Sequence, residues 1–160
     1  MDITYAQTED IPEIMRVYDS ARHFMRQSGN MQQWINGYPQ EALLKEDIEK
    51  KQLYVMRRQG RICGVFAFII GPDPTYAKIE DGSWMSDSEY GTIHRIGGDG
   101  SERGILSAAV AFCEKHIKHL RIDTHEDNLP MQRAVTRNGF ERRGIIYIAD
   151  GTPRIAYEKI

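Results

Sequence analysis

Apolar and polar positions alternate along the chain with two different periods, and these periods predict its strands and helices. Apolar residues at 3–6 predict a first strand. Thr8 or Asp10 then caps a helix whose inward positions are Ile11, Ile14, Met15, Tyr18 and Ala21. Residues 23–38 lose this periodicity at Ser28-Gly29-Asn30, so a short helix and a loop are expected there.

The middle of the chain predicts a helix, a hairpin and a long loop. A helix begins near Pro39, with Leu43, Leu44 and Ile48 on one face. Apolar runs at 53–58 and 61–70 flank the turn Gln59-Gly60, and the second run is long enough to lie centrally in a sheet. Prolines, glycines and acids then make residues 71–90 one long loop, a kind of segment that is often functional.

The C-terminal half alternates strands with helices. The helix near 130 has Asp127 or Asn128 as its cap and Gly139 as its stop. The elements expected in order are a strand at 93–97, a helix ending near 116, a strand at 119–124, a helix at 130–138, and strands at 142–148 and 155–158. Residues 1–160 are therefore expected to form a single domain that mixes strands and helices.

Composition excludes several classes of protein. The formal net charge of −2 provides no overall positive field for nucleic acid. The apolar run at 65–70 is far too short to span a bilayer, and the N-terminus lacks a signal-peptide pattern, so a cytoplasmic protein without a membrane partner is expected. Cys63 and Cys113 lack metal-binding spacing; both are expected to be reduced in the core, and no metal is expected.

The turn GGDGSERG at 97–104 follows an apolar strand and opens directly into a helix, an arrangement suited to holding phosphate on free amides. A P-loop is excluded because no Gly-Lys pair follows at the required distance. A dinucleotide turn is a near miss. Gly98 and Gly100 match its first two glycines, but Arg103 replaces the third, although Asp123 stands at a strand end about 20 residues on. A dinucleotide-binding enzyme stays as one alternative.

A third pattern, Q/R-x-x-G-x-G/A, marks the phosphate loop of the GNAT family of N-acetyltransferases, and SERGIL at 101–106 keeps its middle glycine. THEDNLPMQRAVTRNGF at 124–140 resembles that family's asparagine-led fourth helix, which ends in Gly-Phe. The hairpin at 53–70 and the closing RIAYEKI also fall in family order. This resemblance covers nearly the whole chain. It implies a GNAT-like α/β fold with a mixed sheet of about six or seven strands, about four flanking helices, and splayed strands at 93–97 and 119–124.

The resemblance implies an acyltransferase that moves an acetyl group from acetyl-CoA to a primary amine by direct attack. The amine belongs to a small molecule or a peptide, and formation of a homodimer stays open. Asn128 matches the family's cofactor-contacting asparagine, with Met131 and Val135 further along the same helix. The implied cofactor-binding residues are Ile96, Gly97, Gly98, Gly100, Ser101, Glu102, Arg103, Gly104, Ile105, Asn128, Met131 and Val135.

Two positions depart from the family pattern. Val135 stands where many members carry a tyrosine that protonates the leaving thiolate, and Thr92 stands where many carry a glutamate. A non-catalytic acyl-CoA-binding or regulatory domain is therefore the second alternative.

His94 is the first candidate for the general base, because it shares strand parity with Thr92 beside the expected thioester. The alternative is that His94 packs between strand and loop. Acids of the long loop are expected either to be solvated charges or to attract a cationic amine and act as base. These acids are Glu80, Asp81, Asp87 and Glu89. Tyr90 either packs at the start of the strand or supplies a hydroxyl. Trp34, Tyr38 and Trp84 are expected either to wall a substrate pocket or to pack in the core.

Overall fold

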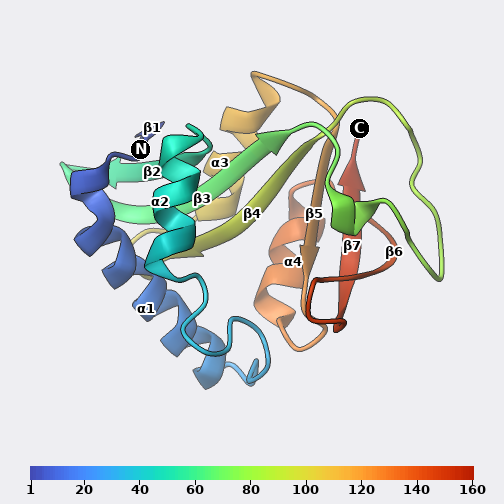
Figure 1. Ribbon diagram of the computed structural model, residues 1–160, viewed down its shortest axis with the longest axis horizontal. Helices are drawn as coiled ribbons and strands as arrows, with labels where there is room; N and C mark the ends of the chain where they lie inside the picture. The colour runs from blue at the N-terminus through green and yellow to red at the C-terminus, as the bar shows by residue number, and fades with distance from the viewer.

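The computed structural model describes residues 1–160 and folds them around one mixed sheet (Figure 1). Its seven strands are β1 (Asp2–Tyr5), β2 (Leu53–Arg58), β3 (Arg61–Ile70), β4 (Gly91–Gly98), β5 (Leu120–Thr124), β6 (Glu141–Tyr147) and β7 (Pro153–Lys159). Its helices are α1 (Ile11–Gln27), α2 (Glu41–Glu49), α3 (Ile105–Glu114) and α4 (Leu129–Arg137), with 3-10 turns η1 (Thr8–Asp10) and η2 (Pro74–Tyr76). The strand order is β1-β2-β3-β4-β5-β7-β6. The α/β fold with a mixed sheet of about seven strands is confirmed.

The predicted elements are confirmed in kind and order, with one exception. The separate short helix expected within residues 23–38 is wrong, because α1 continues to Gln27 before Gly29 adopts a φ of 91°. The long loop at 71–90 contains η2 and a single bridge between Glu80 and Ile145. Both cysteines are free and buried. No helix has the length and apolar character needed to cross a membrane.

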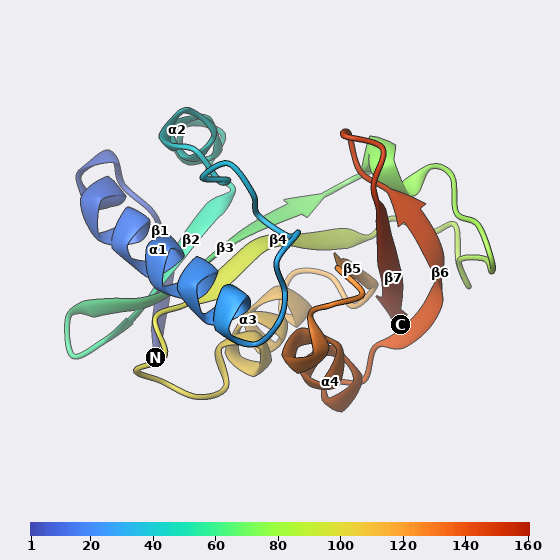
Figure 2. The ribbon, with the colours of Figure 1, turned by 90° about the horizontal axis from the view of Figure 1, so that it is seen from below.

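The sheet separates two helical layers, which Figure 2 shows on opposite faces. Alternate residues of β2 face opposite ways: Leu53 and Val55 pack with α1 and α2, whereas Tyr54 and Met56 pack with α3. The long strand β3 is likewise buried on both faces, which explains its continuous apolar sequence. Over β5 and β7, the loop 71–90 covers the face that α1 and α2 cover elsewhere.

Strands β4 and β5 run parallel but pair only at their beginnings, at Gly91 with Leu120 and Thr92 with Arg121. Beyond that point they diverge, as Figure 1 shows. The edge of β4 that faces β5 therefore has no strand partner over residues 93–98. The expected splay of these two strands is confirmed.

A bulge lies in β4 at Arg95, whose φ of 51° is unusual for a residue other than glycine. The pairing with β3 jumps here from Ala67–His94 to Val65–Gly97. The Arg95 guanidinium donates to both carboxylate oxygens of Asp47, at 3.0 and 2.9 Å. Tyr18 Oη donates to the Arg95 carbonyl at 2.7 Å. Contacts from α1 and α2 thus hold the strained residue in place.

Replacing Asp47 with Ala is expected to lower the free energy of unfolding by about 3–5 kcal/mol, because it leaves the buried Arg95 charge unpaired. The Asp47 side chain is only 1% exposed. Urea denaturation measures the change. Glu46→Ala is the matched control, since Glu46 pairs with Lys50 on the exposed side of α2 and its loss should change stability far less. Equal losses in the two variants would contradict the role given to Asp47.

Candidate functional site

A cavity of about 720 Å³ lies where β4 and β5 separate. The loop between α1 and α2, the start of the loop 71–90, the turn between β6 and β7, and the start of α4 complete its walls. Its polar lining consists of Gln32, Gln33, Asn36, Gln40, Asp73, Thr75, His94, Arg95, Asp123, Thr124, Asn128, Asp150 and Arg154. Segments far apart in the sequence thus meet around one concave, partly charged space, which is the usual form of a small-molecule site.

His94 lies on β4 with its Nε2 atom 2.6 Å from Oδ2 of Asp73. Burial alone would raise the pKa of Asp73, but hydrogen bonds from His94 and Thr75 lower it to about 2. Tyr90 Oη accepts the Asp73 amide at 2.8 Å and fixes the start of the loop. Asp73 therefore stays ionised and accepts a hydrogen bond from Nε2–H of His94, while Nδ1 of His94 makes no hydrogen bond with the chain.

Asp123 lies at the splayed end of β5, in the same cavity. Its Oδ2 atom accepts a 2.6 Å hydrogen bond from Tyr76 Oη. Burial raises the pKa of Asp123, although His94, Tyr76 and Arg154 act in the opposite direction. A second carboxyl group, with properties unlike those of Asp73, thus faces the space beside His94.

Asn128 is the N-cap of α4, and its side chain is bound on both sides. Oδ1 accepts the Met131 amide at 3.2 Å, and Nδ2 donates to Gln33 Oε1 at 2.9 Å. Gln33 Oε1 also accepts from Asn30 Nδ2 at 2.7 Å. The buried asparagine therefore ties the loop between α1 and α2 to the start of α4 across the opening between the splayed strands.

The glycine turn lies outside the cavity lining. Asp99 accepts the Ser101 amide at 2.9 Å and forms ion pairs with Arg16 and Arg61, and Glu102 pairs with Arg58. Gly104 precedes α3 with a φ of 73°, and no side chain caps that helix. The first-turn amides of α3 are thus left without a capping partner, and arginine side chains lie close by.

Several predicted residues line the cavity and others do not. Alongside His94 and Asn128, the structure places Trp34, Tyr38, Ile96 and Met131 there. Val135 is fully buried in the core, and Trp84 packs at 3.9 Å on Arg121, with its Nε1 donating to the Tyr76 carbonyl. The hydroxyl of Tyr90 supports Asp73, and its ring covers the other side of Arg121. The residues outside the lining are Gly97, Gly98, Gly100, Ser101, Glu102, Arg103, Gly104, Ile105, Val135, Trp84, Tyr90, Glu80, Asp81, Asp87 and Glu89.

The sequence prediction missed Asp73, Tyr76 and Arg154, and it considered Asp123 only as the acid that follows a dinucleotide-binding turn. Asp73 stands between two prolines in a loop without periodicity, so nothing local connects it to His94. One sequence signal could have pointed to Asp123. Alternate residues of a strand share a face, so Asp123 lies on the same face of β5 as Arg121. No group of three or more His, Cys, Asp or Glu side chains is arranged to hold a metal ion.

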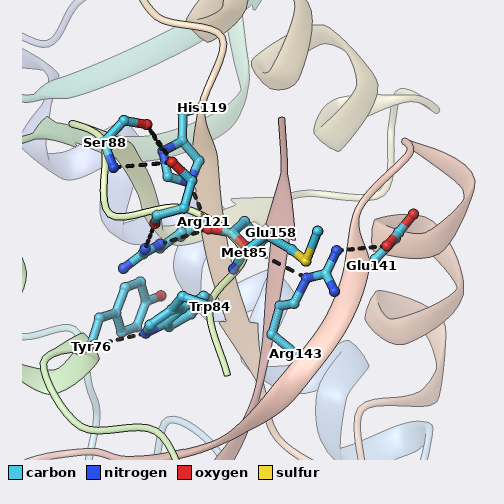
Figure 3. Close-up of polar contacts among 10 residues, drawn as sticks. Tyr76, Trp84, Met85, Ser88, His119, Arg121, Glu141, Arg143 and Glu158 are labelled. Atoms are coloured by element: carbon cyan, nitrogen blue, oxygen red, sulfur yellow. Dashed lines mark hydrogen bonds and ion pairs between the residues drawn. The ribbon is translucent and has the colours of Figure 1, made fainter. Parts of the chain in front are cut away.

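A buried charged cluster anchors the far end of the loop 71–90, as Figure 3 shows. Glu158 on β7 is 1% exposed and accepts from the Met85 amide at 2.7 Å. His119 Nε2 lies 2.6 Å from the same carboxylate, Arg121 Nε donates to it at 3.3 Å, and Arg143 pairs with it at 3.5 Å. The loop that carries Asp73 and Tyr76 at one end is thus bound to the sheet at the other.

Comparison with known proteins gives matches among solved structures. No protein-family model and no curated protein sequence matches the chain. An acetyltransferase of the GNAT family from Streptococcus agalactiae is 31% identical with a TM-score of 0.91, covering 99% of this chain and 94% of that one. One from Listeria monocytogenes is 19% identical with a TM-score of 0.73, covering 99% and 93%.

A third solved structure, the ribosomal-protein-alanine N-acetyltransferase from Brucella melitensis, is 15% identical with a TM-score of 0.63. It covers 100% of this chain and 99% of that one. The Listeria and Brucella structures show the shared fold, and the Streptococcus structure combines near-identity of fold with substantial sequence identity.

Replacing Glu158 with Gln is expected to lower the free energy of unfolding by about 3 kcal/mol or more, because the buried Arg121 loses its anionic partner. Glu141→Gln is the matched control: Glu141 pairs with the same Arg143 at 2.7 Å but is 73% exposed, so less than about 1 kcal/mol is expected. Urea denaturation compares the variants, and limited proteolysis should cut the loop 71–90 faster in Glu158→Gln alone. An uncut loop in a destabilised Glu158→Gln would contradict the anchoring role.

Proposed function

This chain belongs to the GNAT family of acetyltransferases, and on that basis we propose that it transfers an acetyl group from acetyl-CoA to a primary amine held in the cavity. As a member it is an acyltransferase. The observation that carries the proposal is the His94–Asp73 pair, which lines the cavity where β4 and β5 part. A dinucleotide-binding enzyme is disfavoured, because Arg103 stands where its turn requires a third glycine and because the chain belongs to the GNAT family.

The residues around the splay fit acetyl-CoA. The unpaired edge of β4 offers backbone groups of Ile96 to Gly98 to the amide groups of a pantetheine arm. A Cβ at Gly98 would come within 3.1 Å of Ile105, so a larger residue there would narrow the approach to α3. The uncapped amides at the start of α3 suit a pyrophosphate. When bound, acetyl-CoA would supply the acetyl group as a thioester.

The side chains around the cavity can prepare the amine. An amine attacks a carbonyl only after it loses a proton, so a group must receive that proton. Ionised Asp73 holds the Nε2 proton of His94, which leaves the Nδ1 lone pair to accept the amine proton directly or through a water molecule. Asp73 then stabilises the resulting imidazolium. The ionised Asp73 supplies negative charge that attracts a cationic amine into the cavity, and the Asp123 carboxyl lies beside it.

Acetyl-CoA at about 100 times its dissociation constant is expected to stabilise the folded chain by about 2.7 kcal/mol. Differential scanning fluorimetry should show this as a higher melting temperature with acetyl-CoA and none with NAD. NAD shares the adenosine pyrophosphate with acetyl-CoA, so it serves as the control for unspecific binding of that group. Lack of a shift with any acyl-CoA would remove the basis of the proposal.

His94→Ala is expected to lower turnover by about 100-fold or more, because the amine loses its proton acceptor. Asp73→Asn should lower it as well, since an amide no longer holds the Nε2 proton in place. Release of the CoA thiol with a broad panel of amines measures turnover, and it also separates an enzyme from a non-catalytic acyl-CoA-binding domain. His23→Ala, an exposed histidine of α1, is the control. Unchanged turnover in folded His94→Ala would show that another group accepts the amine proton.

A further inference from the structure

Arg154 begins the cavity-facing part of β7 and is buried without an ionic partner. It is 6% exposed and lines the cavity. Its Nη1 atom donates to Thr152 Oγ1 at 3.1 Å and to the Pro153 carbonyl at 2.8 Å, both neutral acceptors of its own turn. Nε and Nη2 donate to no other atom of the chain, so two sides of the guanidinium remain free.

The other buried arginines of this sheet face are paired. Arg95 binds Asp47, and Arg121 binds Glu158 while lying between two aromatic rings. Asp150 and Glu158 are the acids nearest to Arg154 along the chain, each four residues away. Asp150 is exposed, and its Oδ1 accepts the amide and hydroxyl of Thr152. Glu158 is bound by His119 and Arg121. A buried guanidinium is costly when unpaired, and it stays charged, so the site around Arg154 favours an anionic ligand.

Groups of opposite charge stand further along the same cavity. In the pairing of β5 with β7, Asp123 lies opposite Ala156, and Arg154 is two residues away on the same face. Two strand residues span about 7 Å, so the guanidinium and the Asp123 carboxyl are offset along the sheet. No ion pair joins them. Asp73 and His94 lie on the Asp123 side, so the cavity carries an anionic end beside the proposed base and a cationic end at Arg154.

We propose that the acceptor is a small amino-carboxylate, of the free amino acid class, whose carboxylate binds Arg154 while its amine lies beside His94 and Asp123. This inference rests on the proposed amine acetylation. Phosphates of CoA do not account for Arg154, because no residue of the glycine turn at 97–104 lines the cavity. A carboxylate matches the two free sides of the guanidinium, since parallel N–H groups bind both of its oxygens.

Isothermal titration calorimetry of the full chain with CoA present tests the proposal. Each amino acid is compared with the amine that lacks its carboxylate: lysine with cadaverine, arginine with agmatine, tyrosine with tyramine, and histidine with histamine. At least one amino acid should bind about 10-fold or more tightly than its partner. Arg154→Gln should abolish that preference, and Arg154→Lys, which keeps the charge, should retain part of it. Arg137→Gln, on the exposed face of α4, should behave as the unaltered chain does.

Equal or tighter binding of the amine in every pair overturns the inference, as does an undiminished preference in folded Arg154→Gln. If Arg154→Gln does not fold, Arg154→Met is the second variant without the charge, and an undiminished preference in it overturns the inference. Thiol release separates the two proposals. Acetylation without preference for a carboxylate leaves the proposed function in place and overturns this inference. Absence of thiol release with every ligand overturns the proposed function, while the calorimetric comparison still decides the carboxylate site.

Discussion

The ion pair between Arg95 and Asp47 fixes the geometry on which the site depends. A left-handed residue within a strand costs roughly 1–3 kcal/mol, and the bidentate pair together with the Tyr18 hydrogen bond offsets that cost. A bulge bends its strand and increases the local twist. In β4 the bulge begins directly after His94, just beyond the last pair with β5, so the strand turns away where the cavity opens. Helix α2 therefore influences the shape of the site through the contact between its Asp47 and Arg95.

The loop 71–90 is fixed in position because its polar groups form hydrogen bonds and its aromatic rings pack on residues of the sheet. Glu158 binds the Met85 amide, Trp84 and Tyr90 pack around Arg121, and the Asp73 amide near the start of the loop donates to Tyr90 at its end. An irregular segment can be buried only when its backbone and charged groups find partners, and the charged residues of β5 and β7 supply them. The same contacts bring Asp73 to His94, so anchoring and the orientation of the proposed base depend on one set of residues.

The sequence predicts the layers of this fold better than its site, for a physical reason. Strands and helices follow from local periodicity, and the hairpin at 53–70 was predicted with its observed bounds. The His94–Asp73 and Asp123–Tyr76 contacts join residues of different elements, and no local period encodes them. The sequence analysis assigned no role to Asp47, and it took Val135 as a cofactor contact from the family resemblance. Only the packed structure shows that the first is buried beside Arg95 and that the second belongs to the core.

The two substrates proposed for this enzyme would be held by different parts of the chain. The unpaired edge of β4 and the free amides at the start of α3 offer backbone groups, so they require strand geometry and small residues such as Gly98 but few particular side chains. This explains how a phosphate loop can keep the fold while SERGIL retains little of the family's side-chain pattern. The acceptor would instead be bound by side chains. Asp73, His94, Asp123 and Arg154 act there through their charges and protons. Specificity for the amine should therefore depend on these few side chains, and substitutions among them should change the acceptor without changing the fold.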